Sequence, residues 1–327
     1  SEITVTQAIL TLKEIAVEKN SVDEFSRWIK SSGLSSMSEL EIEKASIDAI
    51  DMLVNQNKKK PLTKALESYI SNYPNGLDIK RISYLLAEIL YANKKWDKSI
   101  VNFKRVVSGP RNNYSEKSIV RICQSLLNLD DYSEATVFLE RLESIAEANE
   151  NQIYAVSNLM KIYYENKKYN KAIVYGEKII SLKNINNRVK SDAYFFIARS
   201  SINLGDSKKA LIAFKKLEND SNREYAAEAL YYKALENFEQ KEYLNSNLVI
   251  EKISNEFGGY KKWTARSLLL MSKNFYELGD AFQASFILES VIDNFNQMPN
   301  IVNEAKKNLL KIKQIESKKN SSVEINN

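Results

Sequence analysis

The side chains that most often carry out catalysis are scarce in this sequence. It has no His, which removes the commonest general base and the commonest metal ligand, and its single cysteine is Cys123. Carboxylate pairs such as Asp130-Asp131 and Glu140 with Glu143 could act as acid and base, and Ser200-Ser201 could supply a nucleophile. No nucleophile, base and oxyanion donors come together in one pattern. We therefore expect no catalytic residues, metal site, cofactor, small-molecule substrate or enzymatic activity.

Each of these residues also has a structural interpretation. Asp130-Asp131 is typical of a turn, Glu140 and Glu143 of a helix surface, and Ser200-Ser201 of a helix packing position. Cys123 lies in an apolar helical stretch, where a buried thiol behaves as a small apolar residue. It has no second cysteine to pair with, so the sequence predicts no internal disulfide and an inert thiol.

Composition favours an all-helical protein with a sizeable core. Among 327 residues there are only 8 Gly and 4 Pro, while 44% are hydrophobic. Both numbers are far below those of average proteins, which have about 7% Gly and 5% Pro. Turn-rich β-sandwiches and Gly-rich phosphate loops are therefore excluded. The net charge is +5 with both signs interspersed, and the longest basic run is Lys58-Lys59-Lys60. That run is too short for a nucleic-acid footprint and is typical of a solvated turn.

Neither a membrane span nor a targeting segment is visible in the sequence. No apolar run approaches the roughly 20 residues that a bilayer-spanning helix needs. The first residues, Ser1-Glu2-Ile3, include neither an initiator Met nor a secretion signal. We therefore expect a mature product or a fragment of a longer protein.

A short pattern recurs along the chain at intervals of about 34 to 38 residues. It consists of a small residue, which we call the anchor, three variable positions, and then a large apolar or aromatic residue. The pairs are Ala65/Tyr69, Ser99/Phe103, Ala135/Leu139, Ala210/Phe214, Ser246/Ile250 and Ala284/Leu288, and Ala172 fits the series with Gly176 in the large position.

Each anchor is preceded by a second regular feature. About twelve residues upstream comes an apolar residue followed by a small one, as in Leu86-Ala87 and Ile122-Cys123, on one face of a helix. A polar turn such as Asn93-Lys94-Lys95 separates this helix from the anchor's helix. Each repeat is therefore predicted to be two antiparallel helices whose small residues allow close approach. Because no repeat buries its apolar face alone, the repeats must stack.

Residues Ile82 to Asn113 resemble a tetratricopeptide repeat (TPR), and the resemblance covers about residues 43–298. It implies an all-α, right-handed TPR superhelical solenoid of about eight helix-turn-helix units plus a capping helix. We expect a degenerate N-terminal pair at 1–42, with helices near Val5–Val17 and Val22–Ser31, and seven repeats in one continuous solenoid at 43–298. A C-terminal capping helix at 299–313 and a disordered tail at 314–327 would follow. Lys233 and Asn237 replace apolar residues, which predicts loose stacking of their repeat.

The TPR resemblance implies that the first helices line a concave groove. The register then assigns to it a set that we call the groove residues: Tyr84, Glu88, Tyr91, Gln124, Lys161, Tyr164, Phe195, Arg199, Tyr231, Phe238, Lys273 and Tyr276. They combine an aromatic ladder with a charged column of Glu88, Lys161, Arg199 and Lys273. Such a surface suits an extended peptide or an amphipathic helix. The alternative for each aromatic is that it fills space between neighbouring first helices.

These features favour a non-enzymatic scaffold that mediates protein–protein interaction through the groove, with a protein, peptide or envelope complex as partner. The alternative is a helical-repeat protein that binds single-stranded RNA, because aromatics lie among Lys161, Arg199 and Lys273. Nucleic acid is the less favoured partner, since RNA-reading repeats use polar side chains where this groove has Tyr and Phe.

The order of segments in this chain also resembles that of the C-terminal part of large bacterial TPR proteins of the cell envelope. The repeat that ends in Tyr73-Pro74-Asn75-Gly76 is similar to repeats of the Tol-Pal coordinator and of outer-membrane assembly lipoproteins. This resemblance implies a periplasmic or envelope-associated scaffold.

Overall fold

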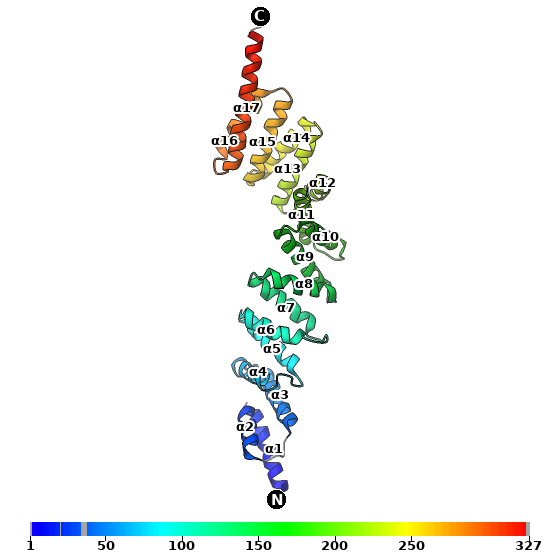
Figure 1. Cartoon of the computed structure of the whole chain (residues 1–327), viewed down its shortest axis with the longest axis vertical. Coiled ribbons are helices and arrows are strands. Elements are labelled where there is room, and N and C mark those ends of the chain that lie inside the picture. Colours follow the sequence, from blue (N-terminus) through cyan, green and yellow to red (C-terminus); the bar gives the residue numbers. More distant parts are fainter. Residues whose placement is uncertain (1, 20, 34–37, 325–327) are drawn as a thin grey trace. The chain divides into compact units, whose positions relative to one another are not determined.

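The computed structural model describes residues 2–19, 21–33 and 38–324. Within these ranges every regular element is a helix (Figure 1). The chain divides into two compact units, unit 1 ending at Ala155 and unit 2 beginning at Val156. The division falls inside one helix, and each unit is a stack of helices that pack against their neighbours in sequence.

The helices of unit 1 are α1 (Glu2–Glu18), α2 (Val22–Ser32), α3 (Glu39–Asn55), α4 (Lys59–Asn72), α5 (Ile79–Ala92), α6 (Trp96–Val107), α7 (Ser115–Asn128) and α8 (Tyr132–Ile145). The dividing helix is α9 (Asn149–Glu165). The remaining helices of unit 2 are α10 (Tyr169–Ser181), α11 (Asn187–Asn203), α12 (Ser207–Lys215), α13 (Arg223–Glu239), α14 (Tyr243–Phe257), α15 (Lys261–Glu277), α16 (Ala281–Asn294) and α17 (Pro299–Glu324).

The predicted helical pairs and their polar turns are confirmed. All seven turns of the predicted repeats place one residue in the left-handed conformation: Asn57, Lys94, Asp130, Lys167, Gly205, Lys241 and Gly279, with φ between 53° and 88°. The next residue donates its N–H back to the last turn of the first helix, as from Lys95 to the Leu90 carbonyl at 2.9 Å. A left-handed residue with this bond ends a helix and reverses the chain.

Close packing between the helices of a pair is also confirmed. Six of the seven anchors are fully buried, namely Ser99, Ala135, Ala172, Ala210, Ser246 and Ala284. Ser246 Oγ donates to the carbonyl of Ala234, the small residue of the preceding helix, at 2.8 Å. Ser200 and Ser201 are fully buried, as a packing role requires.

Cys123 is buried and chemically quiet, as the sequence predicts. None of its surface is exposed, and burial raises the pKa of its thiol to about 12. The thiol therefore stays protonated near neutral pH, and the thiolate that would react is not formed.

Gly176 stands where the other repeats have a large residue, and its lack of a side chain has a structural reason. A Cβ atom built on Gly176 in α10 would lie 2.7 Å from Ile197 Cγ1 in α11. That separation is well inside van der Waals contact. The large side chain missing from α10 is thus replaced by Ile197 from the next helix.

Two predicted boundaries are wrong. The helix α3 begins at Glu39, ahead of the expected repeat start at residue 43, because Ser38 and Glu41 form a reciprocal capping box. The helix α17 runs to Glu324, so it continues through residues that we expected to form a disordered tail from 314. The segment lacks Pro and Gly, and Ile315 is half-buried, so nothing stops the helix at 313. Residues 325–327 lie outside the described residues.

The Tyr73-Pro74-Asn75-Gly76 turn is held by a buried carboxylate that the sequence reading missed. Glu43 Oε1 in α3 accepts hydrogen bonds from Tyr69 Oη and from the Leu77 N–H, each at 2.5 Å. Burial, reinforced by Glu43, raises the pKa of the Tyr69 hydroxyl above its usual value. The turn is therefore tied to the first helix of its own repeat.

Candidate protein-interaction groove

Three groove residues of unit 1, Glu88, Tyr91 and Gln124, belong to one hydrogen-bonded cluster across α5 and α7. Tyr91 Oη donates to Gln124 Oε1 at 2.9 Å, and the guanidinium of Arg121 lies 4.3 Å from the centre of the Tyr91 ring. Arg121 Nε also lies 3.1 Å from Glu88 Oε1, and both side chains are about a quarter exposed. The cluster therefore joins two consecutive first helices.

Arg121 is the member that the sequence reading missed. It lies three residues before Gln124, one turn away on the same face of α7. Burial alone would lower the pKa of its guanidinium, but the hydrogen bonds and charge of Glu88 raise it above its usual value. The cation and carboxylate at this point of the groove are thus satisfied by each other.

The groove residues of unit 2 show the same pairing across α9, α11 and α13. Arg199 in α11 donates to both carboxylate oxygens of Glu228 in α13, at 2.6 Å from Nη2 and 3.0 Å from Nε. The Glu228 side chain is only 3% exposed. Lys161 Nζ in α9 lies 3.5 Å from Asp192 Oδ2 in α11.

Aromatic rings pack around these ion pairs. Phe195 stacks on Tyr225 with ring centres 3.8 Å apart, and the Arg199 guanidinium lies 4.2 Å from the centre of the Phe195 ring. Tyr225 Oη donates to Asp192 at 2.9 Å. Burial, followed by the hydrogen bond and charge of Asp192, raises the pKa of the Tyr225 hydroxyl above its usual value. The neutral tyrosine is therefore the form that the structure holds.

The charged column predicted for the groove is a series of internal ion pairs. Its last cation, Lys273 in α15, lies 3.2 Å from Glu304 in α17. Each charged member of the column thus meets an opposite charge on the following first helix, or on α17 after the last repeat. These pairs connect consecutive helices. The carboxylate of Glu228 is buried against Arg199, whereas Lys161 and Lys273 are 48% and 45% exposed, so their pairs neutralise less charge.

The aromatic groove residues differ in exposure. Tyr84 and Phe195 are only 8% and 6% exposed, so they fill space between helices as the alternative interpretation expects. Tyr84 stacks on Tyr114 with ring centres 4.7 Å apart. The others are half-buried: Tyr91, Tyr164, Tyr231, Phe238 and Tyr276. Only this second group offers ring surface to a partner.

Three groove residues meet at one cavity in unit 2. Phe238 of α13 and Lys273 and Tyr276 of α15 line it, and the far wall is α17 with Asn308, Lys311, Ile312 and Ile315. Asn308 Nδ2 is buried and has no hydrogen-bond partner among the described residues. A buried donor without a partner is costly unless a ligand or water supplies an acceptor. The sequence reading missed this wall because it treated the end of the chain as cap and tail.

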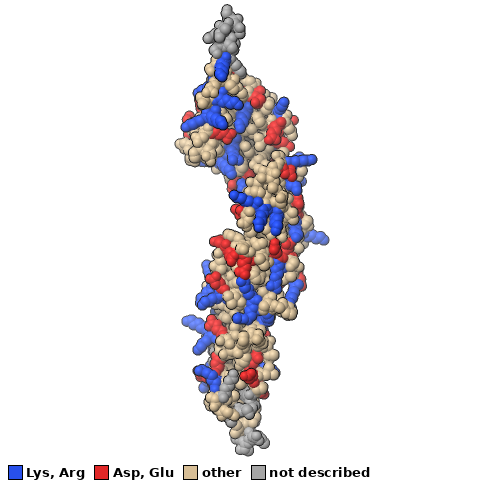
Figure 2. Space-filling model, viewed as in Figure 1, with Lys and Arg blue, Asp and Glu red and all other residues tan. Residues whose placement is uncertain are grey.

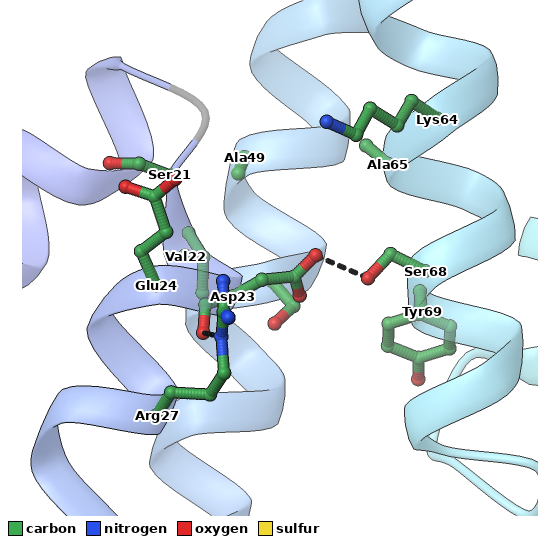
Figure 3. Close-up of a pocket in the computed structure, with 11 residues that line it drawn as sticks. Ser21, Val22, Asp23, Glu24, Arg27, Ala49, Lys64, Ala65, Ser68 and Tyr69 are labelled. Atoms are coloured by element: carbon green, nitrogen blue, oxygen red, sulfur yellow. Dashed lines mark hydrogen bonds between the residues drawn. The ribbon is translucent and has the colours of Figure 1, made fainter.

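A second cavity lies between α2, α3 and α4, away from the groove residues (Figure 3). Ala49 and Ala65 both line it, and Ala65 is the one anchor that is only half-buried. The polar residues around it bond to one another, as Ser68 does to Asp23. We assign no function to this cavity.

A third cavity lies between α12 and α13, and Lys233 and Asn237 are among its lining residues. Lys233 Nζ lies 2.7 Å from Glu218 Oε2. The loose stacking of this repeat stays a prediction.

The face of the molecule in view carries both signs of charge, interspersed over each unit (Figure 2). Within the described ranges, no helix has the length and apolar character that crossing a bilayer requires.

Comparison with known proteins gives structural similarity only. No family model matches the sequence, and no curated protein matches it. Among solved structures, the C-terminal part of a TPR repeat-containing protein from Cytophaga hutchinsonii is similar, with a TM-score of 0.49 and 14% identity over 78% of this chain and 97% of that one. A TPR protein from Parabacteroides merdae gives a TM-score of 0.40 and 14% identity over 81% and 98% of the two chains. PilW, a type IV pilus biogenesis factor, gives a TM-score of 0.35 and 13% identity over 66% of this chain and 93% of that one.

The fold is that of tetratricopeptide repeats. Since the TM-scores and identities above are low, this assignment depends on the chain itself. The buried anchors, the left-handed turns and the contacts between consecutive helical pairs together define that fold.

Proposed function

We propose that this chain is a non-enzymatic scaffold that binds a segment of another protein through its groove. The cavity between α13, α15 and α17 is the point of capture. The observation that carries the proposal is the unpartnered Asn308 amide beside the half-buried rings of Phe238 and Tyr276.

This combination fits a peptide. Phe238, Tyr276, Ile312 and Ile315 supply apolar and aromatic contact, while the Asn308 Nδ2 can donate to a backbone carbonyl of the bound segment. Because the cations of the predicted column are already paired, we expect an apolar or aromatic segment rather than a strongly acidic one.

Site-specific photocrosslinking tests the proposal. The photoreactive residue p-benzoylphenylalanine replaces Tyr276 in cells that produce the full chain, and captured proteins are identified by mass spectrometry. Replacement of Tyr132, which is 47% exposed on α8, is the matched control. We expect one protein to be captured from position 276 and not from position 132, and its capture to be lost when Phe238→Ala is added.

Arg199 is unsuitable as a probe of binding, because its loss would leave the buried Glu228 carboxylate without a partner. Equal capture from positions 276 and 132 would contradict the groove. Recovery of oligonucleotides instead of protein would support the RNA-binding alternative.

We further propose that the scaffold acts at the bacterial cell envelope. The support is the resemblance of its segment order and of the Tyr73–Gly76 repeat to envelope TPR proteins. Fractionation of the native producing cells tests this, and recovery of the full-length protein only with cytoplasmic markers would overturn it.

A further inference from the structure

A row of exposed apolar side chains follows the second helices of the repeats. The residue two positions after each anchor, from the second repeat on, is Val101, Val137, Val174, Ile212, Leu248 or Phe286, and each is between 58% and 63% exposed. Two positions along a helix turn a side chain to the opposite face, so these residues point away from the buried anchors. Core packing therefore does not explain why the residue two positions after the anchor is apolar in all six of these repeats.

In the last two repeats this row widens into a patch. Leu244 and Phe282, one turn before Leu248 and Phe286, are 66% and 82% exposed. We call these four residues the outer patch. The helices that carry them, α14 and α16, both pack on α15, and the two pairs occupy the same positions relative to their anchors. Four such exposed apolar side chains on two helices that pack on the same neighbour are uncommon on soluble proteins and mark interaction sites.

The charges around the outer patch are acidic. With their N-cap residues, α14 and α16 carry six carboxylates (Glu242, Glu251, Glu256, Asp280, Glu289 and Asp293) and one lysine, Lys252. Glu251 and Glu289 lie three residues after Leu248 and Phe286, on the same helix faces, and Lys252 lies four residues after Leu248. Glu289 lies 3.0 Å from Lys313, but both side chains are more than half exposed, so this pair neutralises little.

The same register position in unit 1 has mixed surroundings, since Val137 on α8 lies among Glu134, Glu140 and Glu143 with one cation, Arg141. Val101 on α6 is flanked by Lys98, Lys104 and Arg105 and by one acid, Asp97. Acidic surroundings are thus shared by α8, α14 and α16. The helices α14 and α16 differ from α8 in the second exposed apolar residue one turn earlier, Leu244 or Phe282, that each carries.

We propose that the outer patch binds a basic amphipathic helix of another protein. Leucine-sized side chains one turn apart on such a helix would cover Leu244, Leu248, Phe282 and Phe286, while its Lys and Arg residues meet Glu251 and Glu289. An anionic membrane would be repelled by these carboxylates. A symmetric contact with a second copy would bring like charges together. The site is separate from the groove, so one chain can hold two partners at once.

A designed peptide provides the test. It is a helix of about 18 residues with leucines along one face and lysines elsewhere, and its counterpart has glutamates in place of the lysines. Binding to the full chain is measured by fluorescence anisotropy. We expect the lysine peptide to bind and the glutamate peptide not to bind. The double variant Phe282→Ser, Phe286→Ser should weaken binding about tenfold or more, because both rings lose their contact.

Two further variants keep the proposal falsifiable. The control Val101→Ser, Val137→Ser changes the equivalent exposed positions of unit 1 and should leave the affinity unchanged. Glu251→Lys, Glu289→Lys should weaken the lysine peptide and allow the glutamate peptide to bind. Circular dichroism checks that each variant stays folded.

Three results would overturn the proposal. One is equal binding of both peptides. Another is lysine-peptide binding that the Phe282→Ser, Phe286→Ser variant leaves intact. The third is that the unmodified chain dimerises, or binds vesicles of phosphatidylcholine with phosphatidylglycerol, and that the Phe282→Ser, Phe286→Ser variant does not.

Discussion

Arg199 and Glu228 form the ion pair of unit 2 in which the carboxylate is most completely shielded from water. The guanidinium is 28% exposed and the carboxylate 3% exposed. We expect Arg199→Ala to lower the free energy of unfolding by about 2–4 kcal/mol, because the carboxylate would remain buried without its partner. Chemical denaturation of the purified protein measures this loss.

A matched pair of variants separates this cause from lost packing. Replacing both residues, as Arg199→Met with Glu228→Leu, removes the stranded charge and should recover most of the stability. If the double variant is as unstable as Arg199→Ala, the unpaired carboxylate is not the reason for the loss of stability.

Gly176 provides a second prediction at this scale. Alanine raises helix propensity by about 1 kcal/mol over glycine, which by itself would stabilise α10. The new methyl group would lie 2.7 Å from Ile197 Cγ1, and such overpacking costs about 1–3 kcal/mol. We therefore expect Gly176→Ala to be destabilising by about 1 kcal/mol in thermal or chemical unfolding.

Ile197 is the control for Gly176. In an Ile197→Ala background the clash is gone, and Gly176→Ala should become neutral or stabilising. An unchanged penalty in that background would mean that the two helices are not in this close contact.

The junction between α7 and α9 depends on a single carboxylate. Glu116 in α7 accepts hydrogen bonds from the Glu147 and Ala148 N–H groups and from Asn151 Nδ2, at 3.2, 3.3 and 2.8 Å. Burial would raise the pKa of Glu116, but these bonds and Arg111 together lower it below 4.5. Its contribution to stability is thus present above pH 4.5 and is lost as the pH falls through the lowered pKa.

We accordingly expect Glu116→Gln to cost about 1–2 kcal/mol at neutral pH, because three donors lose a charged acceptor. The difference between the variant and the natural protein should shrink as the pH falls below 4.5, in urea unfolding at several pH values. Glu147→Gln is the control, since the Glu147 side chain is 78% exposed. A pH-independent difference would contradict this account.

At the scale of the whole molecule, α17 closes one end of unit 2. Val302, Ala305 and Ile312 are buried, and Ala305 and Ile312 belong to the same apolar cluster as Leu288 and Val291. Deleting residues 299–327 should lower the stability of unit 2 by about 3–5 kcal/mol, because this surface becomes exposed to water.

Hydrogen exchange followed by mass spectrometry localises the effect of that deletion. Because repeats are stabilised mainly by their nearest neighbours, protection should fall in α15 and α16 and stay unchanged in α5 to α8. Deleting only residues 314–327 keeps Val302, Ala305 and Ile312 in place and should cost far less. An equal loss of protection in α5 to α8 would show that the whole chain unfolds as one.

The repeat pattern predicted the fold well. Small anchors, polar turns and apolar positions are local features that recur in every repeat. Because they recur, the helical pairs could be located from the sequence to within a few residues. The exceptions are the two boundaries of the predicted repeat region. There α3 begins early because of the Ser38 cap, and α17 continues because no residue stops it.

The groove was predicted less completely. Register assigned Lys161, Arg199 and Lys273 to one face, but their partners Asp192, Glu228 and Glu304 lie about 30 residues further along the chain. Sequence alone does not show which of many carboxylates a cation meets. Arg121 and the wall of α17 were missed for the same reason.

The sequence by itself determined the all-helical repeat and the absence of a catalytic pattern built on histidine or paired cysteines, because both follow from residue types at short spacing. Only the tertiary structure decided that the charged column is internally paired, that Tyr84 and Phe195 are buried, and that Asn308 faces a cavity without a partner. It also showed that the apolar row on the second helices is exposed rather than buried. Exposure and pairing depend on what the neighbouring helix places opposite a side chain, and that is fixed only when the repeats stack.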